Sequence, residues 1–287
     1  MKNLYILLPI PLFMDLNLRD KLIFVTGAAG GLGSEIVRSL KSEGAYPMGI
    51  DVNPLDGSEL EKKLDGKTDN FHFFCGDCSS LDFMEEVQRE SVGLYGNSHV
   101  WGLVNCAGLG GGDKKYGGER TLRNLDLVLR SHLHSAVLAI ESFYPRMNVG
   151  ASIVNIGSIE IDMTSPEMVI YTTAKNALLG MTVAYAVTLA PKGIRVNMVS
   201  PGLIEKTGIQ LQLQTAARRE LTTSFERRTP LGRSVYQREV ADAVIYFLSN
   251  RSSMITGENL HVDGGYTRAA WDSGWIKGDI ADVYKPV

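Results

Sequence analysis

At residues 22–33 the chain carries LIFVTGAAGGLG, a short apolar run that passes into a glycine-rich turn. The run has the length and composition of a buried strand, and a helical pattern begins directly after the turn. Glycines permit the tight turn and a close backbone approach, while the free N–H groups at a helix N-terminus favour a bound pyrophosphate. The stretch therefore predicts a strand–turn–helix unit that binds a dinucleotide.

Apolar runs and helix-period segments alternate along the rest of the chain. Strands are expected at 22–26, 46–50, 71–75, 100–105, 152–156, 195–199 and 260–262, and helices near 32–43, 80–92, 120–147, 167–190 and 237–249. Alternation of this kind implies right-handed crossovers and a parallel sheet that is covered on both faces. The predicted fold is α/β, a single-domain doubly wound parallel sheet of the Rossmann type with helices on both faces.

Composition narrows the class of protein. The 287 residues include 44% hydrophobic and 21% charged residues, with a formal net charge of −3. These values suit one globular domain and exclude collagen-like, coiled-coil and disordered chains. The near-balanced charge predicts no nucleic-acid partner and no membrane partner. Three cysteines make no disulfide framework, so a cytoplasmic location is expected.

Three parts are expected along the chain: an N-terminal extension at 1–17, the Rossmann-type domain at 18–267 and a C-terminal tail at 268–287. The apolar run at 4–14 contains two prolines, is too short to span a bilayer and has no small-residue cleavage site after it. Residues 203–228 interrupt the strand–helix alternation and predict a lid. Trp271 and Trp275 in the tail are expected to pack on a neighbouring subunit or at the mouth of the pocket.

Asp51 stands at the end of the second predicted strand, at the distance from the glycine turn that is typical of dinucleotide sites. A carboxylate there accepts hydrogen bonds from ribose hydroxyls and repels a 2′-phosphate. Val52 and Asn53 supply no compensating cation. The sequence therefore predicts NAD as the cofactor in preference to NADP.

Tyr171 and Lys175 are four residues apart in a predicted helix, which places them on one helix face. Ser158 and the stretch Asn105-Cys106-Ala107-Gly108 each follow a predicted strand. Because parallel strands end at one edge of the sheet, these residues are expected to converge beside the cofactor. Positive charge beside a tyrosine favours its phenolate, which suits proton transfer coupled to hydride transfer.

These motifs together resemble the shorter, non-extended branch of the short-chain dehydrogenase/reductase family, from about residue 18 to 267. The resemblance implies that Tyr171 exchanges the proton, Ser158 polarises the substrate oxygen, and Lys175 binds the nicotinamide ribose and lowers the tyrosine pKa. It also implies a homodimer or homotetramer built on the helices near 120–147 and 167–190. The cofactor-binding positions that it implies are Gly27, Gly31, Leu32, Gly33, Asp51, Asp77, Asn105, Ala107, Gly108, Tyr171, Lys175, Pro201, Gly202 and Ile204.

The chain departs from the family pattern at two places. His132 falls where the family has a catalytic asparagine, and it is either a proton carrier or a helix histidine with a structural hydrogen bond. Lys206 stands where the family usually has a threonine, for which Thr207 could substitute by a one-residue shift. Neither change touches Ser158, Tyr171 or Lys175.

Other features have weaker functional interpretations. Cys75 and Cys78 have a metal-ligand spacing, but no second pair completes a site, so no metal is expected. The glycine-rich segment at 109–118 is either a loop over the site or a surface loop. The lid arginines could meet an anionic substrate or lie on a solvated helix face. These are Arg218, Arg219, Arg227 and Arg228.

The leading hypothesis is an NAD-dependent oxidoreductase for a small hydroxy or carbonyl substrate, with sugars and polyols preferred. A sugar-nucleotide epimerase or dehydratase is an alternative, because Gly27, Gly30 and Gly33 also satisfy the motif of the extended branch. The chain lacks the length for a separate substrate domain, which argues against that alternative. A cofactor-binding scaffold without activity is the third possibility, and intact Ser158, Tyr171 and Lys175 argue against it.

Overall fold

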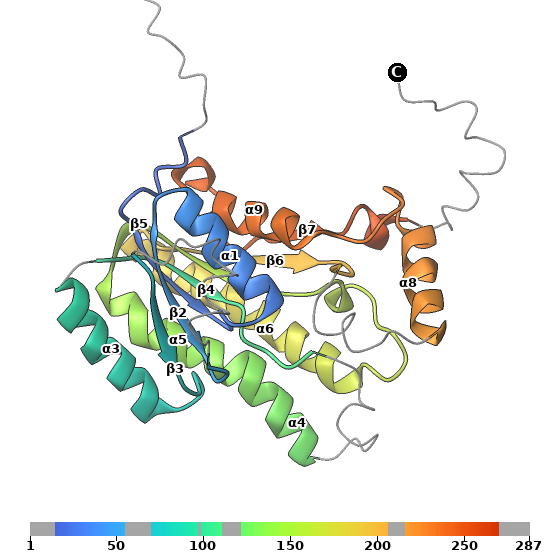
Figure 1. Ribbon diagram of the computed structural model, residues 1–287, viewed down its shortest axis with the longest axis horizontal. Helices are drawn as coiled ribbons and strands as arrows, with labels where there is room; N and C mark the ends of the chain where they lie inside the picture. Colours follow the sequence, from blue (N-terminus) through green and yellow to red (C-terminus); the bar gives the residue numbers. More distant parts are fainter. Residues whose placement is uncertain (1–14, 55–69, 97–98, 111–121, 206–215, 270–287) are drawn as a thin grey trace, which may run out of the picture.

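The computed structural model describes residues 15–54, 70–96, 99–110, 122–205 and 216–269 (Figure 1). Within these residues, seven parallel strands form one sheet in the order β3-β2-β1-β4-β5-β6-β7. The order reverses direction at β1, so β1 and β4 flank the point where such sheets bind ligands. The strands are β1 (Leu22–Thr26), β2 (Tyr46–Asp51), β3 (His72–Cys75), β4 (Val100–Asn105), β5 (Met147–Ile156), β6 (Arg195–Pro201) and β7 (Asn259–Val262).

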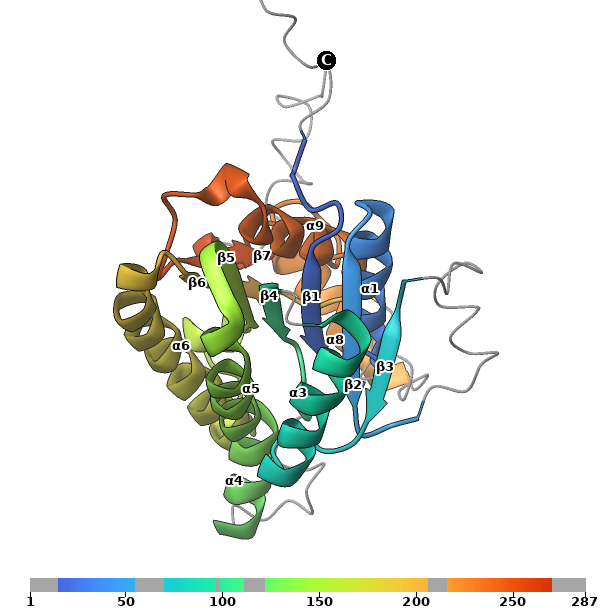
Figure 2. The ribbon, with the colours of Figure 1, turned by 90° about the vertical axis from the view of Figure 1, so that its left-hand side faces the viewer.

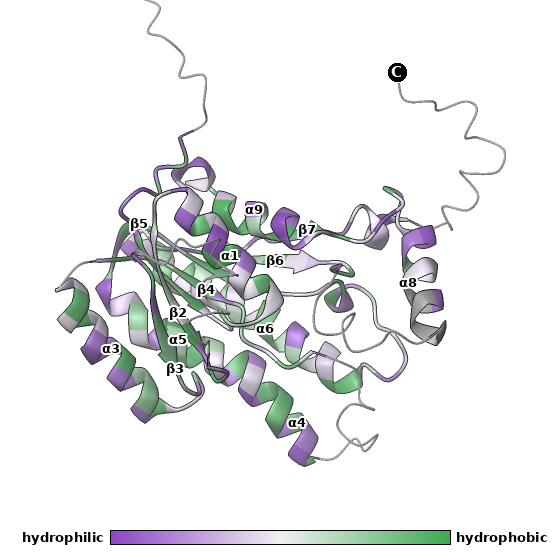
Figure 3. Ribbon diagram, viewed as in Figure 1, coloured by the Kyte–Doolittle hydropathy of each residue, from purple (hydrophilic) through white to green (hydrophobic). Residues whose placement is uncertain are grey.

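Both faces of the sheet are buried, which explains why the strands are apolar runs without polar alternation. In β1, Leu22 and Phe24 join one hydrophobic cluster, and Ile23 and Val25 join the other. Figure 2 shows α1 and α9 on one side of the sheet and α3, α5 and α6 on the opposite side. The strands of the sheet are largely hydrophobic, whereas the outer helices carry hydrophilic residues (Figure 3). The predicted doubly wound fold is confirmed.

The helices match the expected segments with small shifts at their ends. The segment expected as one helix at 120–147 is interrupted by a wide π-helical turn, and its last residue already belongs to β5. The bounds are α1 (Gly31–Ser42), α3 (Leu81–Tyr95), α4 (Leu122–Leu129), the π-helical turn Arg130–His134, α5 (Ser135–Phe143), α6 (Val169–Leu189), α8 (Ala216–Arg228) and α9 (Gln237–Leu248). Short 3-10 turns cover Tyr144–Arg146, Ile159–Ile161, Ala190–Lys192, Asn250–Ser252 and Tyr266–Arg268.

In the part of the chain that the structure describes, no helix is both long enough and apolar enough to cross a membrane.

Candidate active site

The glycine turn between β1 and α1, residues 27–33, is so tightly packed that a side chain would clash at two of its glycines. We call this turn the cradle. Gly27 has a φ of +70°, and a Cβ atom there would lie 2.8 Å from the backbone nitrogen of Ala107. A Cβ atom at Gly33 would lie 2.0 Å from the carbonyl oxygen of Gly27. The helix N-cap, Gly30, provides no side-chain cap, so the first N–H groups of α1, from Gly31 and Leu32 onward, remain for a ligand. This cradle fits a dinucleotide pyrophosphate.

A hydrogen-bonded contact joins this turn to the segment that follows β4. The Thr26 hydroxyl accepts hydrogen bonds from the backbone N–H groups of Cys106 and Ala107, at 3.2 and 3.1 Å. Thr26 and Asn105 are paired across the two neighbouring strands. Two of the sequence-predicted cofactor segments therefore lie side by side at the carboxyl edge of the sheet.

Asp51 ends β2 with its carboxylate against the glycine turn. One oxygen accepts a hydrogen bond from Ala29 N–H at 3.0 Å, and the other accepts from the backbone and side-chain nitrogens of Asn53 at 2.9 and 3.1 Å. Asp77 follows β3 at the same edge, is exposed, and accepts two bonds from Ser79 at 2.8 Å. The two carboxylates lie on the side of the cradle where the sequence predicts the adenosine half of the cofactor.

A chain of buried polar groups crosses from β4 to α6. The Asn105 side-chain nitrogen donates to the Asn155 side-chain oxygen at 2.8 Å, and the Asn155 nitrogen donates to the Thr182 hydroxyl at 2.9 Å. The Thr182 hydroxyl in turn donates to the carbonyl of Leu178. These bonds join β4, β5 and α6, whereas the buried side-chain oxygen of Asn105 has no hydrogen-bond partner within the described residues.

Lys175 lies on α6 with its side chain almost completely buried, at 4% exposure. Its ammonium nitrogen donates to the carbonyl of Ile156, the last residue of β5, at 2.7 Å. Burial lowers the pKa of Lys175 to about 8, and the same nitrogen lies 5.6 Å from the ring centre of Tyr171. The structure thus places a buried cation beside the tyrosine, as the four-residue spacing predicts.

Ser158 follows β5 by two residues and is buried. It caps the 3-10 turn Ile159–Ile161, because its hydroxyl oxygen accepts the N–H of Glu160 at 3.2 Å. Ile156, whose carbonyl accepts the hydrogen bond from Lys175, is two residues before Ser158. Lys175 therefore connects Tyr171 to the carboxyl end of β5, where Ser158 follows.

His132 lies in the π-helical turn and is 4% exposed. Its ring stands edge-on to Tyr171, with 5.5 Å between ring centres. Its Nε2 lies 3.0 Å from the Leu109 carbonyl, which can only accept, so Nε2 carries the proton. A Cβ atom at Gly108 would lie 2.2 Å from Nδ1, which explains why a glycine suits that position.

The charge state of His132 distinguishes its two sequence interpretations. Burial, followed by the positive charge of Lys175, lowers the pKa of His132 to about 3. The imidazole is therefore neutral at physiological pH, and its Nδ1 forms no hydrogen bond within the described residues. The geometry favours a fixed neutral side chain over an imidazolium proton carrier.

The segment after β6 brings the remaining predicted residues to the same edge. Pro201 ends β6, and a Cβ atom at Gly202 would lie 3.2 Å from Asp263. Ile204 pairs with Val235 in an isolated bridge. Lys206 and Thr207 lie outside the described residues, so the second departure from the family pattern has no structural counterpart here.

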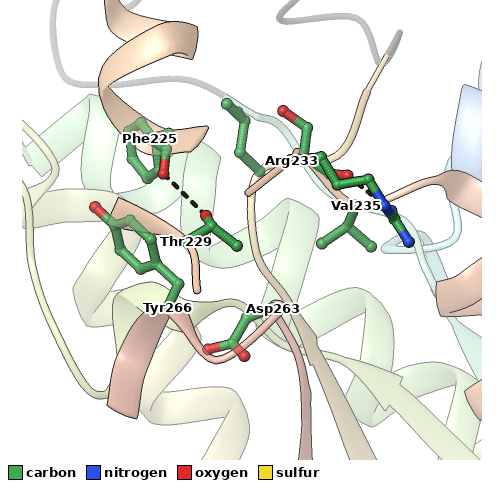
Figure 4. A pocket seen from close by; sticks show the side chains of 8 residues that line it. Phe225, Thr229, Arg233, Val235, Asp263 and Tyr266 are labelled. Atoms are coloured by element: carbon green, nitrogen blue, oxygen red, sulfur yellow. Dashed lines mark hydrogen bonds between the residues drawn. The ribbon is translucent and has the colours of Figure 1, made fainter. Parts of the chain in front are cut away.

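A small pocket lies between this segment, α8 and the end of β7 (Figure 4). The ring of Phe225 on α8 stacks on Tyr266 with centres 5.0 Å apart, and the guanidinium of Arg228 lies 5.1 Å from the Tyr266 ring centre. The Thr229 hydroxyl donates to the Phe225 carbonyl at 2.9 Å. The predicted lid thus contains a helix that is anchored to Tyr266, a residue that the sequence analysis did not single out.

Several sequence interpretations concern side chains outside the described part of the chain. They involve Lys114 and Lys115, the lid residues Arg218 and Arg219, and the tail residues Trp271 and Trp275.

The two cysteines with metal-ligand spacing have different environments. Cys78 is buried, and burial raises its pKa to about 12, whereas Cys75 is exposed. A thiol with a raised pKa stays protonated at neutral pH and binds metals poorly. Among the described residues, no group of three or more potential ligands is arranged to hold a metal ion.

Sequence reasoning missed Asn155, Thr182 and Glu160. Asn155 left a signal, because it is a polar residue inside the fully buried, mostly apolar half of β5. Thr182 and Glu160 left none, since a threonine or a glutamate is ordinary in a helix or a turn and only the structure shows that both are buried.

Comparison with known proteins agrees with this geometry. Residues 27–267 match a family model described as enoyl-(acyl carrier protein) reductase. The chain is 32% identical to sorbitol-6-phosphate 2-dehydrogenase of Klebsiella pneumoniae over 88% of this chain and 98% of that protein. It is 30% identical to a 3-oxoacyl-(acyl-carrier-protein) reductase of Thermotoga maritima over 87% of this chain and 99% of that protein.

A solved structure, the ligand-free aldohexose dehydrogenase of Thermoplasma acidophilum, superposes with a TM-score of 0.77 at 26% identity. The alignment covers 88% of this chain and 96% of that one. Two of these three relatives are named dehydrogenases and one is named a reductase, so all three are oxidoreductases. Because the family model matches most of the chain and the relatives align over nearly their whole length, the chain belongs to the short-chain dehydrogenase/reductase family of oxidoreductases.

Proposed function

We propose that the protein is an NAD-dependent oxidoreductase that interconverts a secondary alcohol and a carbonyl compound. The observation that carries the proposal is the buried Lys175, whose ammonium nitrogen lies 5.6 Å from the ring centre of Tyr171 and donates to the carbonyl of Ile156, two residues before Ser158. A bound nicotinamide supplies the hydride chemistry. The remaining steps, which are binding the oxygen and moving its proton, belong to these side chains.

Each side chain has a distinct part in the proposed reaction. Tyr171 takes the alcohol proton during oxidation and returns it during reduction. Lys175, as a cation near the phenol, favours the phenolate. Ser158 is neutral and holds the substrate oxygen without removing that activation. His132 stays neutral and packs against Tyr171.

The preference for NAD rests on Asp51. Its hydrogen bonds to Ala29 and Asn53 hold a negative charge beside the glycine turn. That charge would repel a 2′-phosphate and accept hydrogen bonds from ribose hydroxyls.

Sugars and polyols are the proposed substrate class. Support comes from two relatives whose names give such substrates, sorbitol 6-phosphate and aldohexoses. Arg228, the last residue of α8, could bind an anionic substituent on the substrate. In the structure its guanidinium lies over the ring of Tyr266.

We also propose a homo-oligomer. Gly180, Val183 and Val187 follow one another on one exposed face of α6, and the two valines are 46% and 73% exposed. Apart from the backbone of α6 itself, no atom of the described residues lies within 4 Å of a Cβ built on Gly180, so a helix of a second copy could approach closely. Burial of such a face in a second copy removes apolar surface from water.

The test of the enzymatic proposal compares wild type with Tyr171→Phe. Purified protein receives NAD or NADP with a panel of sugars, polyols and secondary alcohols, and NADH or NADPH absorbance is followed. We expect turnover with NAD, and a loss of kcat by about 10²–10⁴-fold in Tyr171→Phe, which is the usual contribution of general acid–base catalysis. The variant should still bind NAD.

Other results would contradict specific parts of the proposal. Turnover with NADP alone contradicts the role of Asp51. Equal turnover by Tyr171→Phe contradicts the role of the tyrosine. Tightly retained NAD with substrate conversion but no net NADH would favour the epimerase alternative, and NAD binding without any conversion would favour the scaffold.

A further inference from the structure

The segment 159–168 connects Ser158, at the end of β5, to the first turn of α6, where Tyr171 lies. The proposed reaction needs the Ser158 and Tyr171 hydroxyls to meet one substrate oxygen. Their separation depends on how this segment is held, because no regular element spans it beyond the 3-10 turn Ile159–Ile161. The packing inside the segment therefore bears directly on catalysis.

Glu160 occupies the centre of the segment and is 7% exposed. Its carboxylate accepts the backbone N–H of Ser165 at 3.0 Å and the Ser165 hydroxyl at 2.8 Å. It also accepts the hydroxyl of Thr172, which adjoins Tyr171, at 3.4 Å. The backbone N–H of the same glutamate donates to the Ser158 hydroxyl. One residue therefore touches both ends of the segment.

A second bond closes the same arrangement. The hydroxyls of Thr164 and Thr172 lie 2.9 Å apart. We call Glu160, Thr164, Ser165 and Thr172 the Glu160 clasp. A carboxylate suits its centre because both oxygens accept, whereas an amide offers only one acceptor oxygen.

The next acidic residue of the segment has a different partner. The carboxylate of Asp162 pairs with His261 on β7, not with α6. Asp162 is partly exposed, so its loss should loosen the outer side of the segment without affecting the link between Ser158 and Tyr171. It provides a matched control with the same change of charge in the same segment.

We propose that Glu160 is a positioning residue that sets the relative placement of Ser158 and Tyr171 through the Glu160 clasp. The glutamate acts through its neighbours, because it is 7% exposed and its carboxylate is directed at Ser165 and Thr172. This inference rests on the proposed function of Ser158 and Tyr171. Its consequence is that Glu160 contributes to kcat and leaves cofactor affinity unaffected.

The experiment measures kcat, KM and NAD affinity for Glu160→Gln and Asp162→Asn, with the panel substrate that wild type turns over fastest. We expect Glu160→Gln to lower kcat by about 10- to 100-fold, the usual effect of a misplacement near 1 Å. NAD affinity, measured by fluorescence titration, should match wild type. Asp162→Asn should keep kcat within about 2-fold of wild type, as expected for a partly exposed ion pair.

Two readouts separate positioning from a general structural role. In a Ser158→Ala background the further change Glu160→Gln should cost little, because the group that it positions is already absent. Amide hydrogen exchange of the peptide 159–172 should be faster in Glu160→Gln than in Asp162→Asn, since the Ser165 N–H and hydroxyl must then share one acceptor oxygen.

Thr172→Val and Thr172→Ser supply a test in case Glu160→Gln does not fold. The valine variant lacks the hydroxyl of the Glu160 clasp and should lower kcat, whereas the serine variant keeps the hydroxyl and should match wild type. Equal losses in Glu160→Gln and Asp162→Asn, additive losses with Ser158→Ala, or equal kcat for the two Thr172 variants would overturn the proposal. A fully active Tyr171→Phe would instead contradict the proposed function itself.

Discussion

At the scale of single residues, burial decides what the titratable side chains of the site can do. Burial lowers the pKa of His132 to about 3 and that of Lys175 to about 8. His132 is consequently neutral and Lys175 is still mostly cationic at pH 7. In the proposed reaction, Lys175 therefore supplies charge beside Tyr171, and His132 supplies fixed packing.

Because of its lowered pKa, His132 should destabilise the folded protein in acid. Between pH 6.5 and 3 the unfolded chain binds a proton at this histidine and the folded chain does not, so the free energy of unfolding falls as the pH falls. We expect this free energy to fall more steeply in wild type than in His132→Asn, by at most about 1.4 kcal/mol per pH unit.

Urea denaturation at several pH values between 7 and 4 measures the difference. Carboxylates titrate in both proteins, so their contribution cancels in the comparison. Parallel curves for wild type and His132→Asn would show that the folded protein protonates His132 as readily as the unfolded chain does.

At the scale of elements, the site depends on where strands end and helices begin. The β1–α1 turn works only because its glycines let three backbone segments approach closely. The long helical segment α4–α5 contains a π-helical turn at the residues that face Tyr171, and such turns are frequent at functional sites. The π-helical turn Arg130–His134 thus interrupts a regular helical segment beside the residues of the proposed reaction.

Gly33→Ala tests the tight fit of the first helical turn. Its Cβ atom would lie 2.0 Å from a backbone oxygen, so the turn must shift. We expect the free energy of unfolding to fall by about 1–3 kcal/mol, which is typical of overpacking, and NAD affinity to fall with it. Denaturant titration and fluorescence titration with NAD give the two values.

Gly93→Ala is the matched control, since nothing lies within 4 Å of a Cβ built at that position in α3. This change should instead raise the free energy of unfolding by about 0.5–1 kcal/mol, the helical advantage of alanine over glycine. Similar effects of the two substitutions would contradict the crowded geometry of the turn.

At the scale of the whole molecule, apolar surface remains outside the two hydrophobic clusters that cover the sheet. The exposed face of α6 with Val183 and Val187 is the part that the proposed oligomer would bury. Lys175 contacts both Tyr171 and the carbonyl of Ile156 within one chain.

Val187→Glu tests the proposed interface. A charge on this 73% exposed position should leave the single chain folded but prevent close packing of two apolar helix faces. We expect size-exclusion chromatography with light scattering to show an oligomer for wild type and a smaller species for the variant. Leu94→Glu on α3, at a 51% exposed position, should keep the wild-type mass. A monomeric wild type, or an unchanged mass for Val187→Glu, would show that the α6 face is not the interface.

The sequence by itself determined the fold class and most of the candidate site. Strand runs such as 22–26, the glycine turn, Asp51 and the four-residue spacing of Tyr171 and Lys175 are local patterns, and local patterns follow from backbone sterics and periodicity. Parallel strands then bring their carboxyl ends together, so the convergence of these residues was predictable as well.

Only the tertiary structure decided the charge state of His132, the polar chain through Asn155 and the role of Glu160 as the centre of the clasp. Each depends on burial and on contacts between segments far apart in the sequence, such as the packing of His132 against Gly108 and Leu109. No local pattern encodes desolvation. The physical reason is that a side chain's proton affinity and hydrogen-bond partners are set by whatever the fold packs around it.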